Sequence, residues 1–336
     1  MFKYIVKRLL ISLVVLLGVS IIIYTLVRMM PNDYIDTKFA TALSQGTITQ
    51  EQIDAFKVSY GIGDKTFTGI LGGYFKWLGN MLRGDLGESF KYNMSVTKVI
   101  GDNMWISFAI ALVATILQFL IAIPLGISSA THQYSIRDYT VTVLTMIGLS
   151  LPTYFFAAIC IKLFAVNLGW LPTGGLVDAS ATYDTSTFVG WFSKLGDMIK
   201  HLILPIFVSV VLSLGGLMRY TRTNTLEVLN SDYIRTARAK GLSETKVVYV
   251  HAFRNTLIPL VTLLAGILPS LFGGMMITEQ VFSIPGIGLK AYDALKEGDV
   301  PFVMGYNMFL AVLTVIGTLF SDIMYSVVDP RVKLGK

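Results

Sequence analysis

Six long apolar runs are the feature that most constrains how this chain of 336 residues can fold. The runs cover approximately residues 9–28, 104–130, 139–166, 200–218, 257–281 and 302–327. Each is close to the roughly 20 residues that an α-helix needs to cross the hydrocarbon core of a bilayer. Only 14% of the residues are charged, against about 25% in a typical soluble domain. The sequence therefore predicts an all-α membrane protein with six transmembrane helices.

The first run has basic residues in front of it, as a signal peptide would: Lys3, Lys7 and Arg8. Its apolar core is longer than the 7–15 residues typical of a signal peptide, and no small-residue cleavage pattern follows. We therefore expect residues 1–30 to form an uncleaved first transmembrane helix with a cytoplasmic N-terminus.

The distribution of Lys and Arg predicts which loops face the cytoplasm, because short cytoplasmic loops carry an excess of basic residues. Basic residues gather at the N-terminus, in the 219–255 loop and in the 331–336 tail, whereas the 167–199 loop is acidic. This pattern predicts that both termini face the cytoplasm, with residues 31–103 outside and a five-helix core over 104–330. The net charge of +6 fits basic flanks near anionic lipid rather than nucleic-acid binding.

The outer segment, 31–103, carries helix signals and is therefore expected to be ordered. Thr49 and Gln52 form a T-x-x-Q capping box, a pattern that starts helices. The stretch GYFKWLGNMLRGDLGESF at 73–90 reads as an amphipathic helix rich in aromatic residues. Two alternatives stay open for that helix: it lies on the outer leaflet of the membrane, or it packs inside a small outer subdomain.

The residues that usually carry enzyme chemistry are sparse. Cys160 is the single cysteine and the three histidines, His132, His201 and His251, are far apart in the sequence, so no metal site is predicted. The chain contains no G-x-x-x-x-G-K-[ST] phosphate-binding motif and no convincing catalytic triad or carboxylate pair. We expect neither catalytic residues nor a bound cofactor, and the chain is not predicted to be an enzyme.

Acidic residues near the ends of the runs invite two interpretations. Glu279 lies at the outer end of the fifth run, beside FSIPGIG at 282–288. Its carboxylate either lines a translocation pathway or braces the turn at Pro285 and Gly286. Near the end of the last run, Asp322 and Asp329 are expected to pair with nearby basic residues.

The 219–255 loop is too polar to cross a bilayer, yet it has a helical pattern. Residues 231–241 read SDYIRTARAKG, with small residues placed to give a smooth surface and a glycine placed to end a helix. The smooth surface is expected from Thr236, Ala237, Ala239 and Gly241. A smooth helix of this kind fits a groove on another protein, with Arg235, Arg238 and Lys240 meeting acidic groups at its rim. The alternative is a basic loop that only fixes the membrane topology.

DYIRTARAKGL, followed by VVYVHAFRNTLIPLVT, resembles the signature loop of binding-protein-dependent ABC importer permeases of the dipeptide/oligopeptide type. The resemblance extends over nearly the whole chain. It is carried by KYIVKRLL with YTLVRMMPND, WLGNMLRGDLGESF, TEQVFSIPGIGLKAYDAL with DVPFVMG, and DIMYSVVDPRVK. Arg235, Thr236 and Ala237 replace the more general Glu-Ala-Ala, Pro259 lies farther from Gly241, and PND at 31–33 replaces PGD. The first two departures resemble the peptide-type branch.

The resemblance implies a type I ABC importer permease fold in a bacterial inner membrane, and alternating access driven by ATP. It implies four kinds of partner: a homologous second permease, two cytoplasmic ATPase subunits that use ATP and Mg, an extracytoplasmic solute-binding protein, and a peptide substrate. The residues that would dock into the ATPase are Tyr233, Ile234, Arg235, Thr236, Ala237, Arg238, Ala239, Lys240 and Gly241. Other functions stay open: a nickel-chelate or glutathione permease of the same branch, a self-contained secondary transporter or channel, and a structural or sensory membrane scaffold.

Overall fold

The computed structural model describes residues 2–28, 39–41, 43–46, 48–60 and 66–328. The PND sequence at 31–33, Asp329 and the basic tail at 331–336 lie outside these residues.

The described chain is almost entirely helical, with one two-stranded hairpin. Its elements are α1 (Phe2–Arg28), α3 (Gln50–Tyr60), α4 (Phe67–Leu82), β1 (Glu88–Ser89), β2 (Met94–Ser95), α5 (Val96–Thr131), α6 (Ile136–Ser150), α7 (Thr153–Cys160), η1 (Ile161–Asn167), α8 (Phe188–Leu229), α9 (Asp232–Ala239), α10 (Glu244–Lys246), η2 (Val247–Ala252), α11 (Phe253–Thr262), α12 (Leu264–Phe272), α13 (Met276–Val281), α14 (Ile287–Glu297) and α15 (Val300–Val328). The two η elements are π-helices. The strands pair antiparallel, Glu88 with Ser95 and Ser89 with Met94.

Within the residues that the structure describes, four helices are long and apolar enough to cross a membrane by themselves: α1, α5, α8 and α15. Two further pairs pass the same test but are bent, namely α6 with α7–η1 and α10–α11 with α12–α13. Counting each bent pair as one span gives the six expected spans. All six of the apolar runs in the sequence therefore correspond to helical segments of the structure.

The third run, expected as one helix over 139–166, is instead bent by 105° between Ser150 and Thr153. Leu151 adopts an extended conformation with φ −84° and ψ 127°. Because the ring of Pro152 disfavours the helical conformation in the residue before it, the helix ends there and restarts as α7. The bend therefore has a local cause that is visible in the sequence.

The fifth run, 257–281, is also bent, by 53° near Leu263. Pro259 lies inside α11 and Pro269 lies inside α12, and proline removes a backbone hydrogen bond within a helix. In contrast, the fourth run is longer than expected: α8 covers 42 residues and continues to Leu229. The first eleven residues of the expected 219–255 loop are therefore part of a helix.

Small residues allow α5, α6 and α8 to approach one another closely. A methyl group on Gly126 in α5 would come within 2.8 Å of Thr221 Cβ in α8. On Gly215 in α8 it would come within 2.6 Å of the carbonyl oxygen of Thr145 in α6. Glycine at such crossings brings backbones together and is typical of membrane helix packing.

The described residues between α1 and α5 fold as a small subdomain against two spans. Helix α3 begins with the expected capping box: the Thr49 amide donates to Gln52 Oε1 (2.9 Å) and the Gln52 amide donates to Thr49 Oγ1 (3.3 Å). On α4, Trp77 is buried and its ring centroid lies 5.9 Å from that of Tyr24 in α1. These contacts support the packing alternative for the inner face of α4, while Phe75 on the same helix remains exposed.

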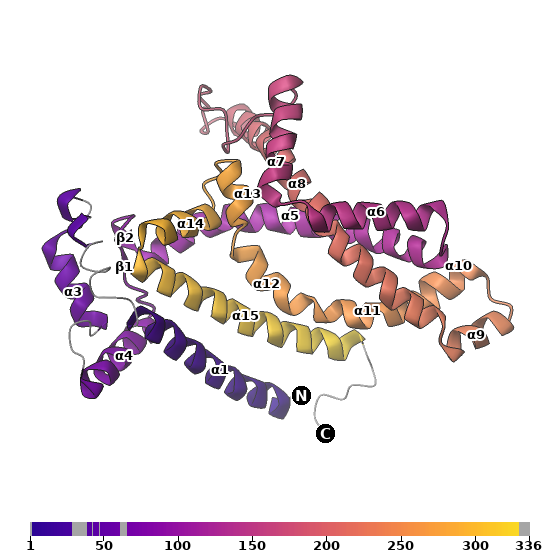
Figure 1. The fold of residues 1–336 in the computed structure, drawn as a ribbon, viewed down its shortest axis with the longest axis horizontal. Coiled ribbons are helices and arrows are strands. Elements are labelled where there is room, and N and C mark those ends of the chain that lie inside the picture. The colour runs from indigo at the N-terminus through magenta and orange to yellow at the C-terminus, as the bar shows by residue number, and fades with distance from the viewer. Residues whose placement is uncertain (1, 29–38, 42, 47, 61–65, 329–336) are drawn as a thin grey trace.

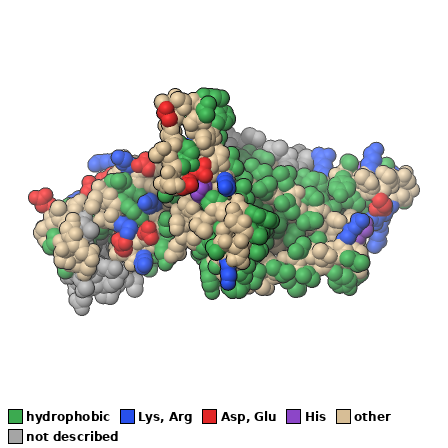
Figure 2. Space-filling view, turned by 90° about the horizontal axis from the view of Figure 1, so that it is seen from above, with side chains coloured by type: hydrophobic (Ala, Val, Ile, Leu, Met, Phe, Trp, Pro, Cys, Tyr) green, Lys and Arg blue, Asp and Glu red, His purple; other side chains and the backbone are tan. Residues whose placement is uncertain are grey.

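The elements form an elongated molecule, with the hairpin, α3 and α4 at one end and α9 and α10 at the other (Figure 1). Helix α7 and the start of α8 project sideways from the middle. Hydrophobic side chains cover the central region in the space-filling view, and charged side chains gather towards both ends (Figure 2). This distribution matches a helical bundle with an apolar belt for lipid and two polar ends.

Candidate functional site

Helix α9 is a short helix that projects at one end of the molecule (Figure 1). Asp232 lies in its first turn and Arg238 in its last turn, placements that favour a helix because of its dipole. Gly241 follows with φ +75°, a conformation that glycine adopts without strain. The expected helix and its terminating glycine are therefore both present.

The inner face of α9 packs against the chain itself. Ile234 is fully buried and Ala237 is nearly so, and both belong to one apolar cluster with Val247 and Ala252 of η2. The expectation that Ala237 belongs to a smooth outer surface is wrong, because this face of α9 is used for packing on η2. The inner face of α9 is therefore not available to a partner protein.

The outer face of α9 is solvent-exposed. Its exposed residues are Tyr233, Arg235, Thr236, Arg238, Ala239 and Lys240, followed by Gly241. Arg238 is held by Glu244, with Nε–Oε1 and Nη2–Oε2 distances of 2.8 and 3.3 Å, and Arg235 lies 3.6 Å from Asp232. Exposed pairs of this kind add little to stability. Seven of the nine residues expected to dock thus lie on one accessible surface.

A buried ion pair ties the turn between α5 and α6 to α8, close to the loop that carries α9. Arg222 donates from Nε to Asp138 Oδ1 at 2.8 Å and from Nη2 to Oδ2 at 2.9 Å. Ser129 also donates to Asp138 Oδ1, and the amide of Tyr134 donates to Oδ2 at 3.0 Å. The carboxylate of Asp138 therefore has its charge and both its oxygens satisfied although the residue is buried.

This ion pair was not expected from the sequence. Arg222 counted as one of several loop cations, and Asp138 was not singled out. One local signal was available, because Ser135 caps α6 by accepting a hydrogen bond from the Asp138 amide at 3.3 Å. A serine three residues before an aspartate is a helix-start pattern, and it places Asp138 at this helix end.

Glu279 is completely buried at the start of α13. Its Oε1 accepts hydrogen bonds from Ser107 Oγ at 2.7 Å and from the Met275 amide at 3.0 Å, and its Oε2 accepts from the Leu289 amide at 2.9 Å. A methyl group on Gly286 would come within 2.4 Å of Oε2. Glu279 therefore braces the turn between α13 and α14 against α5, while its suggested role in a pathway stays a prediction.

At the opposite end from α9, Asp299 joins the hairpin to the start of α15. Its Oδ2 accepts from Ser89 Oγ at 2.5 Å and from the Lys91 amide at 3.2 Å, and its Oδ1 accepts from the Phe302 amide at 3.2 Å. Burial raises the pKa of this carboxyl, and the hydrogen bonds only partly oppose that effect. Lys91 and Glu297 form a second link between the hairpin and the end of α14.

This raised pKa predicts a pH dependence for the end of the molecule that carries the hairpin. Since the folded state binds the Asp299 proton more tightly than the unfolded chain does, its contribution to stability is complete below the ordinary carboxyl pKa and declines as pH rises through the raised value. We expect Asp299→Asn to remove this part of the dependence, as measured by hydrogen exchange at residues 88–95 between about pH 4 and pH 7. Glu297→Gln is the control, and an unchanged profile in Asp299→Asn would contradict the assignment.

The expected pairing of Asp322 is also present: Arg8 in α1 lies 3.0 Å from Asp322 in α15. His201 lies in the middle of α8, where its Nδ1 is 2.9 Å from the backbone oxygen of Asp197. Cys160 is buried in an apolar cluster with Leu204 and Phe282. These contacts account for each side chain through packing or helix-to-helix links.

Comparison with known proteins identifies the family. The model of the family described as binding-protein-dependent transport system inner membrane component matches residues 122–334. The oligopeptide transport system permease protein AppB of Bacillus subtilis is 39% identical over 334 residues, which cover 99% of this chain and 100% of that protein. A putative peptide permease of Brucella ovis is 33% identical, and the dipeptide transport system permease DppB of Alkalihalophilus pseudofirmus is 32% identical; both alignments cover 99% of this chain and 100% of the relative.

Among solved structures, an inward-facing conformation of the methionine ABC transporter MetNI is similar, with a TM-score of 0.49 and 18% identity over 69% of this chain and 96% of that chain. The family match includes α9 and Glu279, and the multi-pass helical architecture agrees with it. The expected fold class, a type I ABC importer permease, is confirmed. The chain therefore belongs to the family of binding-protein-dependent transport system inner membrane components.

Proposed function

We propose that this chain is a permease subunit that carries di- and oligopeptides across the inner membrane in an ATP-driven importer. The observation that carries the proposal is the 39% identity, along the whole chain, to a protein named as an oligopeptide permease. Further relatives that align over the whole chain are named as peptide or dipeptide permeases. ATP is hydrolysed by separate subunits in such importers, so this chain supplies the pathway and not the ATPase activity.

The proposed topology places both termini and α9 in the cytoplasm and residues 31–103 outside. The excess of Lys and Arg in the loop that carries α9 supports this orientation. The proposed partners are a homologous second permease, two ATPase subunits and an extracytoplasmic solute-binding protein. ATP and Mg²⁺ would be bound by the ATPase subunits, with no cofactor held by this chain.

We place the ATPase contact on the outer face of α9, around Tyr233, Thr236 and Ala239. The inner face, through Ile234 and Ala237, would pass a displacement of α9 to η2 and from there to α11. The ATPase subunits can shift the conformational equilibrium of the permease only if they bind its two conformations with different affinities. Docking at α9 supplies such a difference, and rigid movement of the spans would then open the pathway to one side at a time.

The substrate is tested by reconstituting the permease with its partner subunits and binding protein in proteoliposomes. We expect ATP-dependent uptake of labelled di- to pentapeptides and no comparable uptake of glutathione or a nickel chelate. Uptake of one of those two compounds in place of peptides would contradict the peptide assignment. Transport by the chain alone, without ATPase subunits, would instead support a self-contained secondary transporter.

Replacing Gly241 with valine is expected to lower peptide uptake at least about tenfold, while the ATPase subunits continue to hydrolyse ATP. Valine is strongly disfavoured at positive φ, so the end of α9 would be displaced from the ATPase. A methyl group at Gly241 would meet no atom within 4 Å, so a clash inside this chain would not explain the loss. Uptake and ATP hydrolysis are measured on the same proteoliposomes.

Two variants serve as controls for that result. Gly241→Asn should retain more uptake than Gly241→Val, since asparagine tolerates positive φ. Thr245→Val, an exposed position in the same loop, should transport normally. Normal uptake by Gly241→Val would argue against α9 as the coupling element.

A further inference from the structure

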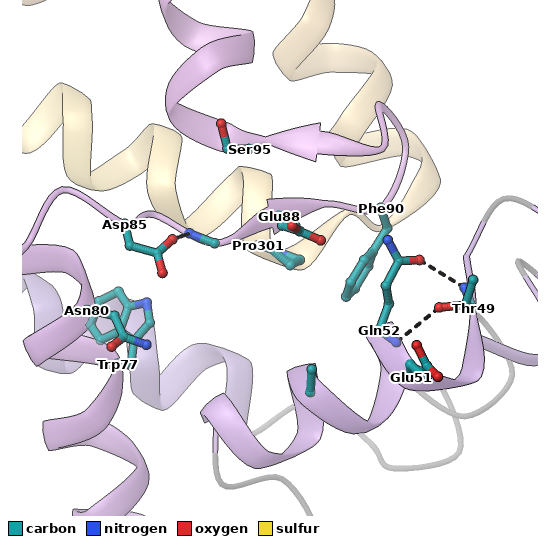
Figure 3. Close-up of a pocket in the computed structure, with 12 residues that line it drawn as sticks. Thr49, Glu51, Gln52, Trp77, Asn80, Asp85, Glu88, Phe90, Ser95 and Pro301 are labelled. Atoms are coloured by element: carbon teal, nitrogen blue, oxygen red, sulfur yellow. Dashed lines mark hydrogen bonds between the residues drawn. The ribbon is translucent and has the colours of Figure 1, made fainter.

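The outer subdomain contains a groove with a volume of about 670 Å³, formed by α3, α4, the hairpin and the start of α15 (Figure 3). Its walls come from segments far apart in the chain, including Glu51 on α3, Trp77 on α4 and Pro301 on α15. The helices that form it pack on α1 and α15 through the cluster of Tyr24, Trp77 and Met304. The groove therefore has rigid support on the spans.

The groove is acidic. Among the described residues that line it, three carry a charge, Glu51, Asp85 and Glu88, and all three are acidic and exposed. Within the described part of the chain, the carboxylates of Glu51 and Glu88 have no ion-pair partner. The neighbouring hollow on the other side of Phe90 is lined by Lys91 and Lys296 as well as by acids, so the excess of negative charge belongs to this groove.

The groove also offers an unused hydrogen-bond donor. Trp77 lines it and is only 5% exposed, yet its indole Nε1 has no acceptor among the described residues. Figure 3 shows Trp77 and Asn80 together at one end of the groove and Phe90 towards the other. The ring is buried, but its Nε1 atom is not fully enclosed, so the N–H is open to a hydrogen-bond acceptor in the groove. The aromatic side chains, the free donor and the acidic rim together suit a ligand that has an apolar stem, a cation and a backbone carbonyl.

We propose that this groove receives a basic surface loop of the extracytoplasmic binding protein, anchored by an arginine side chain. This inference rests on the proposed function. Arginine carries a long apolar stem, stacks on aromatic rings and donates to two carboxylates at once. Its guanidinium would lie between Glu51 and Glu88, with the carbonyl of the loop accepting from Trp77. Electrostatic complementarity of this kind sets both the rate and the orientation of docking.

The position of the groove favours the binding protein over the transported peptide. The groove lies at the end of the molecule opposite α9 (Figure 1), on the segment that we place outside the membrane. It is built mainly on residues 49–95, which precede the matched family region at 122–334, and not between α5 and α8. A protein that delivers substrate would meet this surface before the spans.

The test uses the assembled transporter in nanodiscs and the purified binding protein. We expect Glu51→Lys with Glu88→Lys to raise the Kd for the binding protein at least about tenfold and to weaken its dependence on salt. Asp54→Lys is the matched control, since Asp54 is exposed on the same helix but does not line the groove. Trp77→Phe keeps an aromatic ring without the donor and should weaken binding by a smaller factor.

The outcomes separate this inference from the proposed function. Suppose that the wild-type transporter binds the binding protein and takes up peptides, and that the Kd is unchanged in Glu51→Lys/Glu88→Lys. That result would overturn the groove assignment but not the importer function. Unchanged binding with selective loss of uptake of cationic peptides would assign the groove to the substrate. No binding of the purified protein to the wild-type transporter would overturn both. Cross-linking from cysteine placed at Ala55, which lines the groove, should recover an arginine-bearing peptide of the binding protein.

Discussion

Replacing Arg222 with methionine is expected to lower the free energy of unfolding by about 3–5 kcal/mol, because the Asp138 carboxylate would remain buried without its counter-charge. The loss should be large because Arg222 donates twice to that carboxylate. It should appear as a lower midpoint of unfolding in a titration of the detergent-solubilised protein with sodium dodecyl sulfate. Arg219→Met is the control, since Arg219 is exposed on the same helix.

A second variant separates the charge from the packing. When an ion pair is replaced by apolar residues on both sides, stability is often recovered. We therefore expect Asp138→Leu combined with Arg222→Met to be more stable than Arg222→Met alone. If Arg222→Met and the double variant both have the same midpoint of unfolding as Arg219→Met, the ion pair does not hold the α5–α6 turn to α8.

Replacing Glu279 with leucine is expected to cost about 3 kcal/mol or more, because the amides of Met275 and Leu289 would lose their acceptor at partly buried positions. Each unsatisfied buried donor costs about 1–3 kcal/mol. Glu279→Gln keeps one acceptor oxygen and should cost less. The same unfolding titration measures the loss, and faster proteolysis within residues 282–288 would locate it at the turn.

Gln280→Leu provides the comparison for this site, because Gln280 is the next residue and is exposed. It should unfold like the wild type. Equal midpoints of unfolding for Glu279→Leu and Gln280→Leu would show that the hydrogen bonds of Glu279 do not contribute to stability. Retained stability with lost transport would instead favour the pathway interpretation of Glu279.

Features that depend on neighbouring residues could be predicted from the sequence. The apolar runs, the Thr49–Gln52 capping box and the end of α9 at Gly241 all follow from short-range rules about helix length and termination. The bend at Leu151 could also have been predicted, since Pro152 follows it directly. Its angle could not, because the packing of α7 on the rest of the bundle determines that angle.

Features that depend on folding distant segments together could not be predicted. Asp138 and Arg222 are 84 positions apart and Ser107 and Glu279 are 172 apart, and no rule of local spacing pairs such residues. The direction of Ala237 was missed for a related reason. A small residue fits equally well against a partner protein or against the chain's own η2, and only the fold decides between them.

The length of α5 has a mechanical consequence. The helix covers 36 residues, with Pro124 inside it, and is about 54 Å long at 1.5 Å per residue. It joins the hairpin directly at one end, and at the other its Ser129 contacts Arg222 beside the loop of α9. Treated as a stiff rod, it would convert a tilt of about 5° at one end into a displacement of about 5 Å at the other. A small tilt of α5 at one side of the bilayer would thus displace its other end by about the length of a side chain.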